Sequence, residues 1–299
     1  MSNRCKTITF FSYKGGAGRS STALNTLPFL VKELNADAKH PILLLDMDLD
    51  SAGMTYLLGC DKFFQKNYDV KKFLLNEEKW SSEQTDDLAH HPLLKHFLPV
   101  GELLGVEREA VLFLGDNDEL PIDNDQMDGK KDELFKKLRT FCKNNSIPAY
   151  VMDSAAGDQF SAILATENSK AVVCCMRPTM QFRIGTFNYL NRLAKNSFES
   201  EIILLPTVVP ENDLMLDGEM QKERAISNIL YRTSKINDTL SIHTDFVCHE
   251  NFGINEVHRF KWQEGVLYLI AQNQDLSSDE KTAYERYGRL AALLKDIGD

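Results

Sequence analysis

The sequence predicts a single α/β domain with a mostly parallel, twisted sheet and helices on both faces. Apolar runs of strand length recur along the chain without polar alternation, which is typical of strands that are buried on both faces. Segments with helical spacing lie between several of these runs, as expected where right-handed crossovers join parallel strands. The chain has 299 residues, a length that one domain can accommodate.

The apolar runs mark the expected strands, and the segments between them mark the helices. The expected strands are 7–11, 42–45, 111–114, 150–152, 171–176, 202–205 and 246–248, and the expected helices include 20–34, 130–143 and 181–195. Polar and acidic stretches such as NEEKWSSEQTDD and GDNDELPIDNDQMDG favour loops or a small helical insertion. We therefore expect one domain over residues 1–299 with a variable insertion at about 60–146.

Composition narrows the class of protein. The formal net charge is −10, from 34 basic and 44 acidic residues, and it disfavours nonspecific nucleic-acid binding, which needs clustered Lys and Arg. The first residues contain no apolar stretch of signal-peptide length, and no run approaches the ~18 apolar residues of a membrane span, so we expect a cytoplasmic protein without a membrane partner. The six scattered cysteines contain no C-x-x-C pair, which argues against a disulfide framework or a cysteine metal site.

The stretch FFSYKGGAGRSSTALN resembles a phosphate-binding loop between a strand and a helix, except that Arg19 stands where the general pattern has lysine. Glycines let such a loop turn sharply and aim its N–H groups at phosphate oxygens, and the helix dipole adds positive potential there. Ser20 is placed to offer its hydroxyl to Mg²⁺. The predicted cofactor-binding residues in this loop are Gly15, Gly16, Ala17, Gly18, Arg19, Ser20 and Ser21.

Carboxylates follow two further apolar runs. PILLLDMDLDSAG ends in Asp46 and Asp48, and PAYVMDSAAG contains Asp153 with Gly157 four residues on. In open parallel sheets, ligands bind at the carboxyl edge of the strands. Asp153 has the position of a Walker B acid, which holds Mg²⁺ partly through water, and Gly157 would let a backbone N–H approach the γ-phosphate. We therefore expect a Mg²⁺ site that combines Ser20 and Asp153.

These motifs together resemble the deviant Walker A ATPases of the ParA/MinD group, within the SIMIBI class of P-loop NTPases. KGGAGRS is similar to their K-G-G-x-G-[KR]-[ST] loop, and DMDLDSAG and DSAAG resemble their two switch segments. RPTMQFRIGT and EVHRFKWQEGVL also resemble the KGGVGR-variant branch of this group. The sequence departs from the pattern at Asp50, Ser51 and Ala52, which replace Glu-Ala-Pro, and at Ala156, where many members have proline.

The resemblance implies binding of ATP and Mg²⁺ and a homodimer that encloses the nucleotide. It assigns Lys14 to the phosphates of the opposite subunit and Arg19 to the β- and γ-phosphates. Arginine carries the same positive charge as lysine and adds a planar fork of N–H donors, so arginine in place of lysine is compatible with phosphate binding. By the same resemblance Asp48 positions the attacking water, and Asp46 joins Ser20 and Asp153 at the Mg²⁺ site by supporting the metal partly through water. The roles of Asp46 and Asp48 could be exchanged.

The resemblance also places the adenine pocket near Thr207 or Pro210, where the family often has an asparagine. A threonine hydroxyl cannot make the paired contacts of an amide, so the preference for ATP over GTP rests on the resemblance.

Two further helical segments are expected to have structural roles. Residues 130–139 have the pattern of an amphipathic helix with a solvated basic face, and the C-terminal helix is expected to pack against the sheet rather than on a membrane.

The predicted function is that of a slow ATPase that acts as a molecular switch, dimerises around Mg-ATP and regulates a protein partner. Two alternatives stay open: a nucleotide-sensing module with negligible hydrolysis, and a DNA-partition ATPase. The acidic balance disfavours the second of these.

Overall fold

The computed structural model describes residues 5–49, 51–60, 69–75, 96–116, 135–177, 179–195, 199–207, 227, 242–243, 260–263, 266–269 and 278–297. Everything below concerns this part of the chain. The expected strand 246–248 and Pro210 lie outside it.

A central eight-stranded sheet organises the fold, with strand order β3-β4-β2-β5-β1-β6-β7-β8. All neighbouring strands in it are parallel except β3 and β4, which are antiparallel. Its strands are β1 (Lys6–Ser12), β2 (Ile42–Met47), β3 (Leu98–Pro99), β4 (Val111–Leu114), β5 (Ala149–Ala156), β6 (Ala171–Met176), β7 (Glu201–Pro206) and β8 (Ile242–His243). A separate antiparallel pair comprises β9 (Phe260–Gln263) and β10 (Val266–Leu269).

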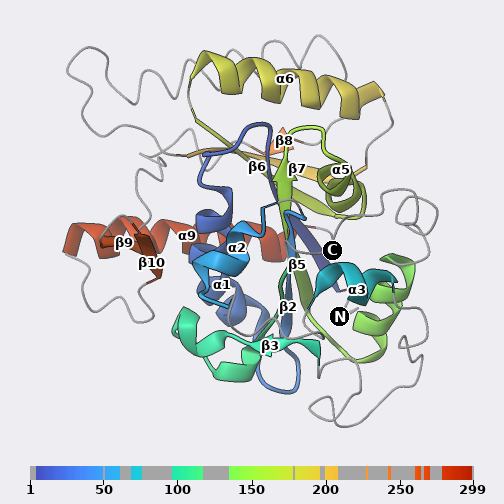
Figure 1. The fold of residues 1–299 in the computed structure, drawn as a ribbon, viewed down its shortest axis with the longest axis vertical. Helices are drawn as coiled ribbons and strands as arrows, with labels where there is room; N and C mark the ends of the chain where they lie inside the picture. Colours follow the sequence, from blue (N-terminus) through green and yellow to red (C-terminus); the bar gives the residue numbers. More distant parts are fainter. Residues whose placement is uncertain are drawn as a thin grey trace.

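Helices lie on both sides of the sheet, as the sequence predicted. Figure 1 shows α1 and α9 on one side and α3 and α5 on the other. The α-helices are α1 (Arg19–Leu34), α2 (Gly53–Leu57), α3 (Val70–Leu75), α5 (Phe160–Glu167), α6 (Met180–Lys195) and α9 (Ser278–Asp296), and residues 135–144 are also helical. Two short 3₁₀ helices are η5 (Gly101–Leu104) and η6 (Arg108–Ala110).

The predicted elements agree closely with the observed ones. Strands 111–114 and 171–176 have the predicted bounds, and α1 and α6 each begin one residue before their predicted start. β5 continues to Ala156, because the switch-like DSAA segment is itself extended and pairs with β1. The segment predicted as an insertion contributes β3 and β4 to the main sheet.

The strands are buried on both faces because alternate residues enter two different cores. In β2, Ile42 and Leu44 belong to a cluster that includes residues of α1 and α9, whereas Leu43 and Leu45 belong to a second cluster with helix 135–144 and α5. This explains why the strand segments read as uninterrupted apolar runs. Each face of the sheet therefore needs its own covering helices.

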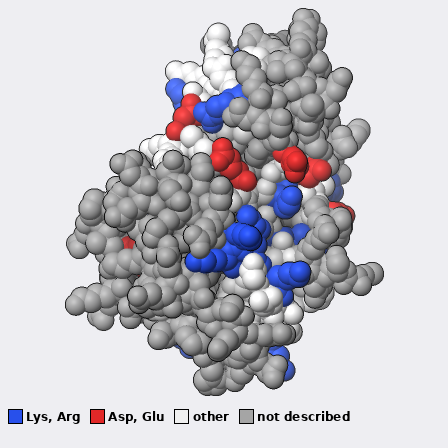
Figure 2. All heavy atoms as spheres, turned by 90° about the vertical axis from the view of Figure 1, so that its right-hand side faces the viewer, with Lys and Arg blue, Asp and Glu red and all other residues white. Residues whose placement is uncertain are grey.

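Helix 135–144 is amphipathic, as predicted. Phe135, Leu138 and Cys142 are buried, whereas Lys136, Arg139 and Lys143 are exposed. Figure 2 views the side of the molecule that carries this helix and shows Lys and Arg side chains gathered on it. A local basic surface therefore exists on an acidic protein. None of the described helices combines the length and apolarity that crossing a lipid bilayer requires.

The C-terminal helix α9 packs chiefly against α1, whereas the sequence predicted packing against the sheet; its buried side chains belong to the same core cluster as one face of the sheet. Its buried side chains are Tyr287, Leu290, Ala291 and Leu294. Asn25 Nδ2 of α1 donates to Tyr287 Oη over 3.4 Å, and a methyl group added at Gly288 would lie 3.1 Å from the Phe29 ring. Buried Lys6 donates from Nζ to the Ile297 carbonyl over 2.9 Å, which ties the end of this segment to β1. The helix is thus part of the core.

We expect Leu294→Ala to destabilise the protein by about 2–5 kcal/mol, because it removes a fully buried side chain and leaves a cavity between α1 and α9. The neighbouring Leu293 is only partly buried, so Leu293→Ala should cost clearly less. Urea unfolding followed by circular dichroism measures both values. Equal losses for the two variants would show that α9 does not pack as described.

Candidate functional site

The carboxyl edge of the sheet brings together the acids that the sequence placed after separate strands. Asp46 of β2 and Asp153 of β5 are register partners on adjacent parallel strands, so their side chains lie close together. The register of β1 with β5 shifts between Phe10 and Ser12, which marks a bulge beside Asp153. Asp46 and Asp153 are both completely buried. A buried pair of carboxylates needs compensation by protons, hydrogen bonds or cations.

The loop between β1 and α1 forms the other side of the site. Gly16 and Gly18 have φ values of 78° and 70°, in the left-handed region where glycine carries no steric penalty. α1 begins at Arg19 and has no acidic residue in its first turn, so its N-terminal dipole is not neutralised by its own side chains. The loop also packs on α6, because a methyl group at Gly185 would lie 1.9 Å from the Tyr13 ring.

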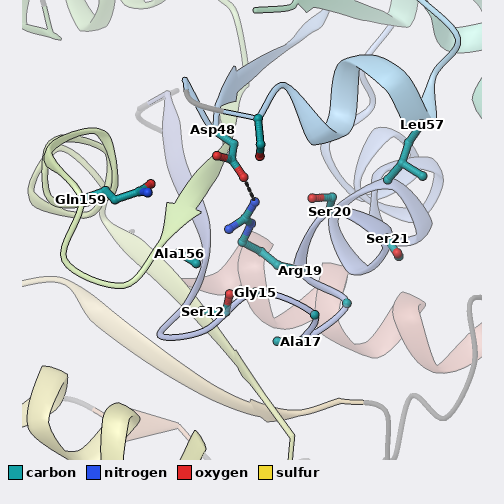
Figure 3. A pocket seen from close by; sticks show the side chains of 13 residues that line it. Ser12, Gly15, Ala17, Arg19, Ser20, Ser21, Asp48, Leu57, Ala156 and Gln159 are labelled. Carbon is teal, nitrogen blue, oxygen red and sulfur yellow. Dashed lines mark hydrogen bonds and ion pairs between the residues drawn. The ribbon is translucent and has the colours of Figure 1, made fainter. Parts of the chain in front are cut away.

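A pocket of about 400 Å³ opens over this loop, at the N-terminus of α1 (Figure 3). A methyl group added at Gly15 or Gly16 would meet no heavy atom within 4 Å, so the loop leaves open space above its backbone. The residues that line the pocket are Ser12, Gly15, Gly16, Ala17, Gly18, Arg19, Ser20, Ser21, Asp48, Ser51, Leu57, Ala156 and Gln159. All seven loop residues predicted from the sequence line it, together with Asp48.

Arg19 joins the loop to two of the acids. Its Nε donates to Asp153 Oδ1 over 2.5 Å, and its Nη2 donates to Asp48 Oδ2 over 2.8 Å. Burial lowers the pKa of Arg19, but the Asp153 and Asp48 carboxylates outweigh this effect and raise the pKa above its ordinary value. Ser20 donates from Oγ to the other oxygen of Asp153 over 2.5 Å. Both oxygens of Asp153 are thus hydrogen-bonded to α1.

Asp46 lies deeper and is bound by α2. The backbone N–H and the hydroxyl of Thr55 both donate to Asp46 Oδ2, each over 2.9 Å. Burial, followed by the charge of Asp153, raises the pKa of Asp46 to about 8, although the two Thr55 bonds act in the opposite direction. Burial also raises the pKa of Asp153, and Arg19 and Ser20 oppose that shift. Asp46 is therefore mostly protonated at neutral pH, and Asp153 is the acid that pairs with Arg19.

The oxygen donors at this edge suit a hard cation, but they do not form a complete metal site. In the described segments, no group of three or more His, Cys, Asp or Glu side chains is arranged to hold a metal ion. The Ser20 hydroxyl and the Asp153 carboxylate already lie within hydrogen-bond distance of each other. Oxygen ligands supplemented by water and substrate phosphates are the set that Mg²⁺ prefers. These residues therefore fit Mg²⁺ that arrives together with phosphates.

Five predicted site residues within the described part of the chain do not line the pocket: the buried acids Asp46 and Asp153, and Lys14, Gly157 and Thr207. Lys14 is exposed and donates from Nζ to Gln181 Oε1 of α6 over 3.2 Å. Gly157 has a φ of 74°, but its N–H donates to the Ser12 carbonyl over 3.0 Å instead of pointing to the pocket. Thr207 is buried after β7, where its N–H donates to the Met176 carbonyl.

Several residues of the site had not been found from the sequence. Ser12, Ser51 and Gln159 line the pocket but were not among the predicted site residues, although Ser12 and Ser51 lie within the loop-like and switch-like stretches. Thr55 lies nine residues after Asp46, and only the return of α2 onto β2 brings them together. The Thr55 hydroxyl also accepts from the N–H of Asp116, which forms a buried ion pair with Lys71 of α3 over 3.1 Å. Sequence spacing carries no signal for such contacts.

We expect Asp46→Asn to make stability less dependent on pH. With a folded-state pKa of about 8 and an unfolded value of about 3.9, the folded wild type binds one more proton between these values. Its stability therefore falls as pH rises toward 8.

Relative to the wild type, the variant should gain about 1–4 kcal/mol between pH 5 and pH 8, measured by urea unfolding. The control is Asp158→Asn, which changes an exposed acid just after β5. Parallel pH profiles for wild type and Asp46→Asn would contradict the assignment of this proton.

Neither a protein-family model nor a curated protein sequence matches the chain. Solved structures do match it over nearly its whole length. An McdA variant from Cyanothece in complex with ATP has a TM-score of 0.63 and 14% identity, and the match covers 99% of this chain and 98% of that one. A plasmid partition protein of Borrelia burgdorferi bound to AMPPNP has a TM-score of 0.55 and 18% identity over 98% and 100%.

The cell-division protein MinD of Pyrococcus horikoshii, in complex with Mg-ADP, has a TM-score of 0.55 and 15% identity over 98% of this chain and all of that chain. At these identities the similarity concerns the fold. The sheet order and the loop between β1 and α1 described above are consistent with it. The chain therefore has the P-loop fold of the ParA/MinD ATPases.

Proposed function

We propose that this protein binds Mg-ATP in the pocket over residues 15–21 and hydrolyses it as a dimeric switch that regulates a protein partner. One observation carries the proposal: the whole predicted loop lines one open pocket at the N-terminus of α1, with Arg19 and Ser20 both bonded to Asp153. Backbone N–H groups and an uncompensated helix N-terminus favour phosphate at this place. The structural neighbours that are complexed with ATP, AMPPNP or Mg-ADP support this choice of ligand.

Each group at the pocket has a role in this proposal. Arg19 and the loop backbone bind the phosphates, and Ser20 with Asp153 holds Mg²⁺, which neutralises phosphate charge when bound. Asp48 lines the pocket at the start of the segment that leads to α2, so it is the acid placed to orient the attacking water. Asp46 and Asp153 are both fully buried, but Asp153 is bonded to Ser20 in the pocket lining whereas Asp46 is held by Thr55, so we assign Asp46 a supporting role. Between Asp46 and Asp48, the geometry therefore favours Asp48 as the acid that orients the attacking water.

The position of Lys14 supports catalysis shared between two subunits. Its side chain is exposed, contacts α6 and does not line the pocket of its own chain. A lysine at the start of the loop that faces outward is available to a second copy. In this proposal Lys14 reaches the phosphates held by the opposite subunit, and hydrolysis ends that contact. The dimer would present its partner-binding surface only while ATP is bound.

Slow, Mg²⁺-dependent phosphate release by the purified chain tests the proposed activity, measured with a coupled phosphate assay. Asp48→Ala should lower turnover by about 10²-fold or more if Asp48 orients the water, whereas it should still bind ATP. Ser51→Ala is the matched control, because Ser51 also lines the pocket but has no proposed part in orienting the water, so its turnover should fall much less than that of Asp48→Ala. Binding of ATP without turnover in the wild type would favour the nucleotide-sensing alternative.

Mixing two inactive variants tests the role of Lys14 in trans. We expect Lys14→Ala and Asp48→Ala each to be inactive alone, and their mixture to recover phosphate release, because a mixed dimer has one complete site. Lys39→Ala changes another exposed lysine, after α1, and should behave as wild type. A mixture as inactive as its components would place both residues on the same subunit's site and overturn the shared arrangement.

A DNA-partition ATPase is the second candidate, and one observation favours it. The side chains of Lys136, Arg139 and Lys143 are exposed on helix 135–144. Figure 2 shows Lys and Arg side chains gathered on this side of the molecule. Binding to DNA through such a surface weakens steeply with salt, because phosphate contacts release counterions. ATP-dependent binding to DNA that is lost on charge reversal of these residues would favour partition over regulation of a protein partner.

A further inference from the structure

The side chain of Arg19 is hydrogen-bonded to two acids that have roles in the proposed binding and hydrolysis of Mg-ATP. Through Nε and Nη2 it contacts Asp153 and Asp48 at the same time, over 2.5 and 2.8 Å. Arg19 is only 8% exposed, and Asp153 is completely buried. Figure 3 shows the Arg19 guanidinium directed toward Asp48, across the pocket from the backbone of the glycine loop. The cation of the phosphate-binding loop thus points at carboxylates instead of at the open space over Gly15 and Gly16.

The same contacts engage the groups assigned to magnesium. One oxygen of Asp153 accepts from Arg19, and the other accepts from the Ser20 hydroxyl. Arg19, which is expected to bind phosphate, is therefore hydrogen-bonded to Asp153, one of the residues expected to hold Mg²⁺, and the other, Ser20, is bonded to the same acid. Breaking this arrangement on one side only would leave a buried carboxylate or a buried guanidinium without its partner, which is strongly unfavourable.

We propose that Arg19 is a latch that makes the binding of nucleotide and of Mg²⁺ depend on each other. This inference rests on the proposed function. ATP alone would draw Arg19 toward its phosphates and leave Asp48 and Asp153 uncompensated beside added negative charge. Mg²⁺ alone would have to share the carboxylates with a guanidinium of like charge. When both bind together, Arg19 turns to the phosphates while the magnesium ion takes over the charge of the carboxylates.

This latch gives a physical reason for arginine at position 19. The planar guanidinium presents several fixed N–H groups, so Arg19 can contact two carboxylates through two different nitrogens. A lysine has one nitrogen at the end of a flexible stem and holds such a pair less firmly. Arg19→Lys should therefore weaken the latch while it keeps the positive charge.

The test is a set of ATP-binding isotherms by calorimetry on the full chain, with excess Mg²⁺ and with EDTA. The wild type should bind ATP at least about tenfold more tightly with Mg²⁺, within the usual range of coupling between two ligands. Asp48→Asn removes one carboxylate charge of the latch. It should bind ATP several-fold more tightly than the wild type in EDTA, so that the dependence on Mg²⁺ shrinks.

Asp158→Asn is the matched control, because it removes an equal charge just after β5 from an acid that pairs with Arg192 and not with Arg19. Its dependence on Mg²⁺ should equal that of the wild type. Equal ATP affinity in Mg²⁺ and EDTA for the wild type, or an effect of Asp158→Asn as large as that of Asp48→Asn, would overturn the latch while the proposed function stands. Absence of ATP binding under both conditions would overturn the proposed function and the latch together.

A spectroscopic measurement follows the Arg19 side chain directly in the wild type. The Nε–H of an arginine held by a buried carboxylate exchanges slowly, so Arg19 should give a protected ¹⁵Nε–H signal, assigned by its loss in Arg19→Lys. We expect this signal to persist with Mg²⁺ alone and to shift when Mg²⁺ and ATP are both added. A signal that moves on addition of Mg²⁺ alone, or an unprotected Nε–H, would show that Arg19 does not hold the carboxylates.

Discussion

Burial of acidic side chains at one edge of the sheet is the constraint on which the rest of this structure depends. Asp46 and Asp153 are completely inaccessible and lie side by side in register, so both cannot be charged without compensation. Burial and the charge of Asp153 raise the pKa of Asp46, which favours its protonated form, and Asp153 is hydrogen-bonded to Arg19 and Ser20. Every other feature of the site is arranged around these two forms of compensation.

The elements around the acids supply the compensating groups. The turn at Gly16 and Gly18 starts α1 so that Arg19 and Ser20, its first two residues, face β5. α2 returns to β2 and donates to Asp46 through Thr55, and the same hydroxyl connects to the buried Lys71–Asp116 pair. Together with the N–H of Asp48, which donates to Asp46 Oδ1, these contacts form a polar network that joins α1, α2 and α3 to the acids at the ends of β2 and β5. α9 stabilises this arrangement from behind, since it packs on α1 and is tied to β1 through Lys6.

Local patterns predicted most of the fold and the position of the site. Uninterrupted apolar runs identified the central strands because both faces of the sheet are covered, and glycines followed by Arg19 and Ser20 marked the loop. The contacts of Lys14 with Gln181 and of Gly157 with Ser12 could not be predicted, because they join elements that sequence spacing does not relate. The pairing of Arg19 with Asp48 could not be predicted either, because Asp48 follows a different strand and only the packed sheet brings it to the start of α1.

The sequence by itself determined the fold class, the loop residues 15–21 and the acids at the ends of β2 and β5. These follow from hydrophobic periodicity and from side-chain chemistry within short segments, which need no knowledge of distant neighbours. Only the tertiary structure decided which acid is protonated, which one pairs with Arg19, and that Thr55 holds Asp46 in place. Those properties depend on burial and on distances between separate strands and helices, and burial is a property of the packed chain alone.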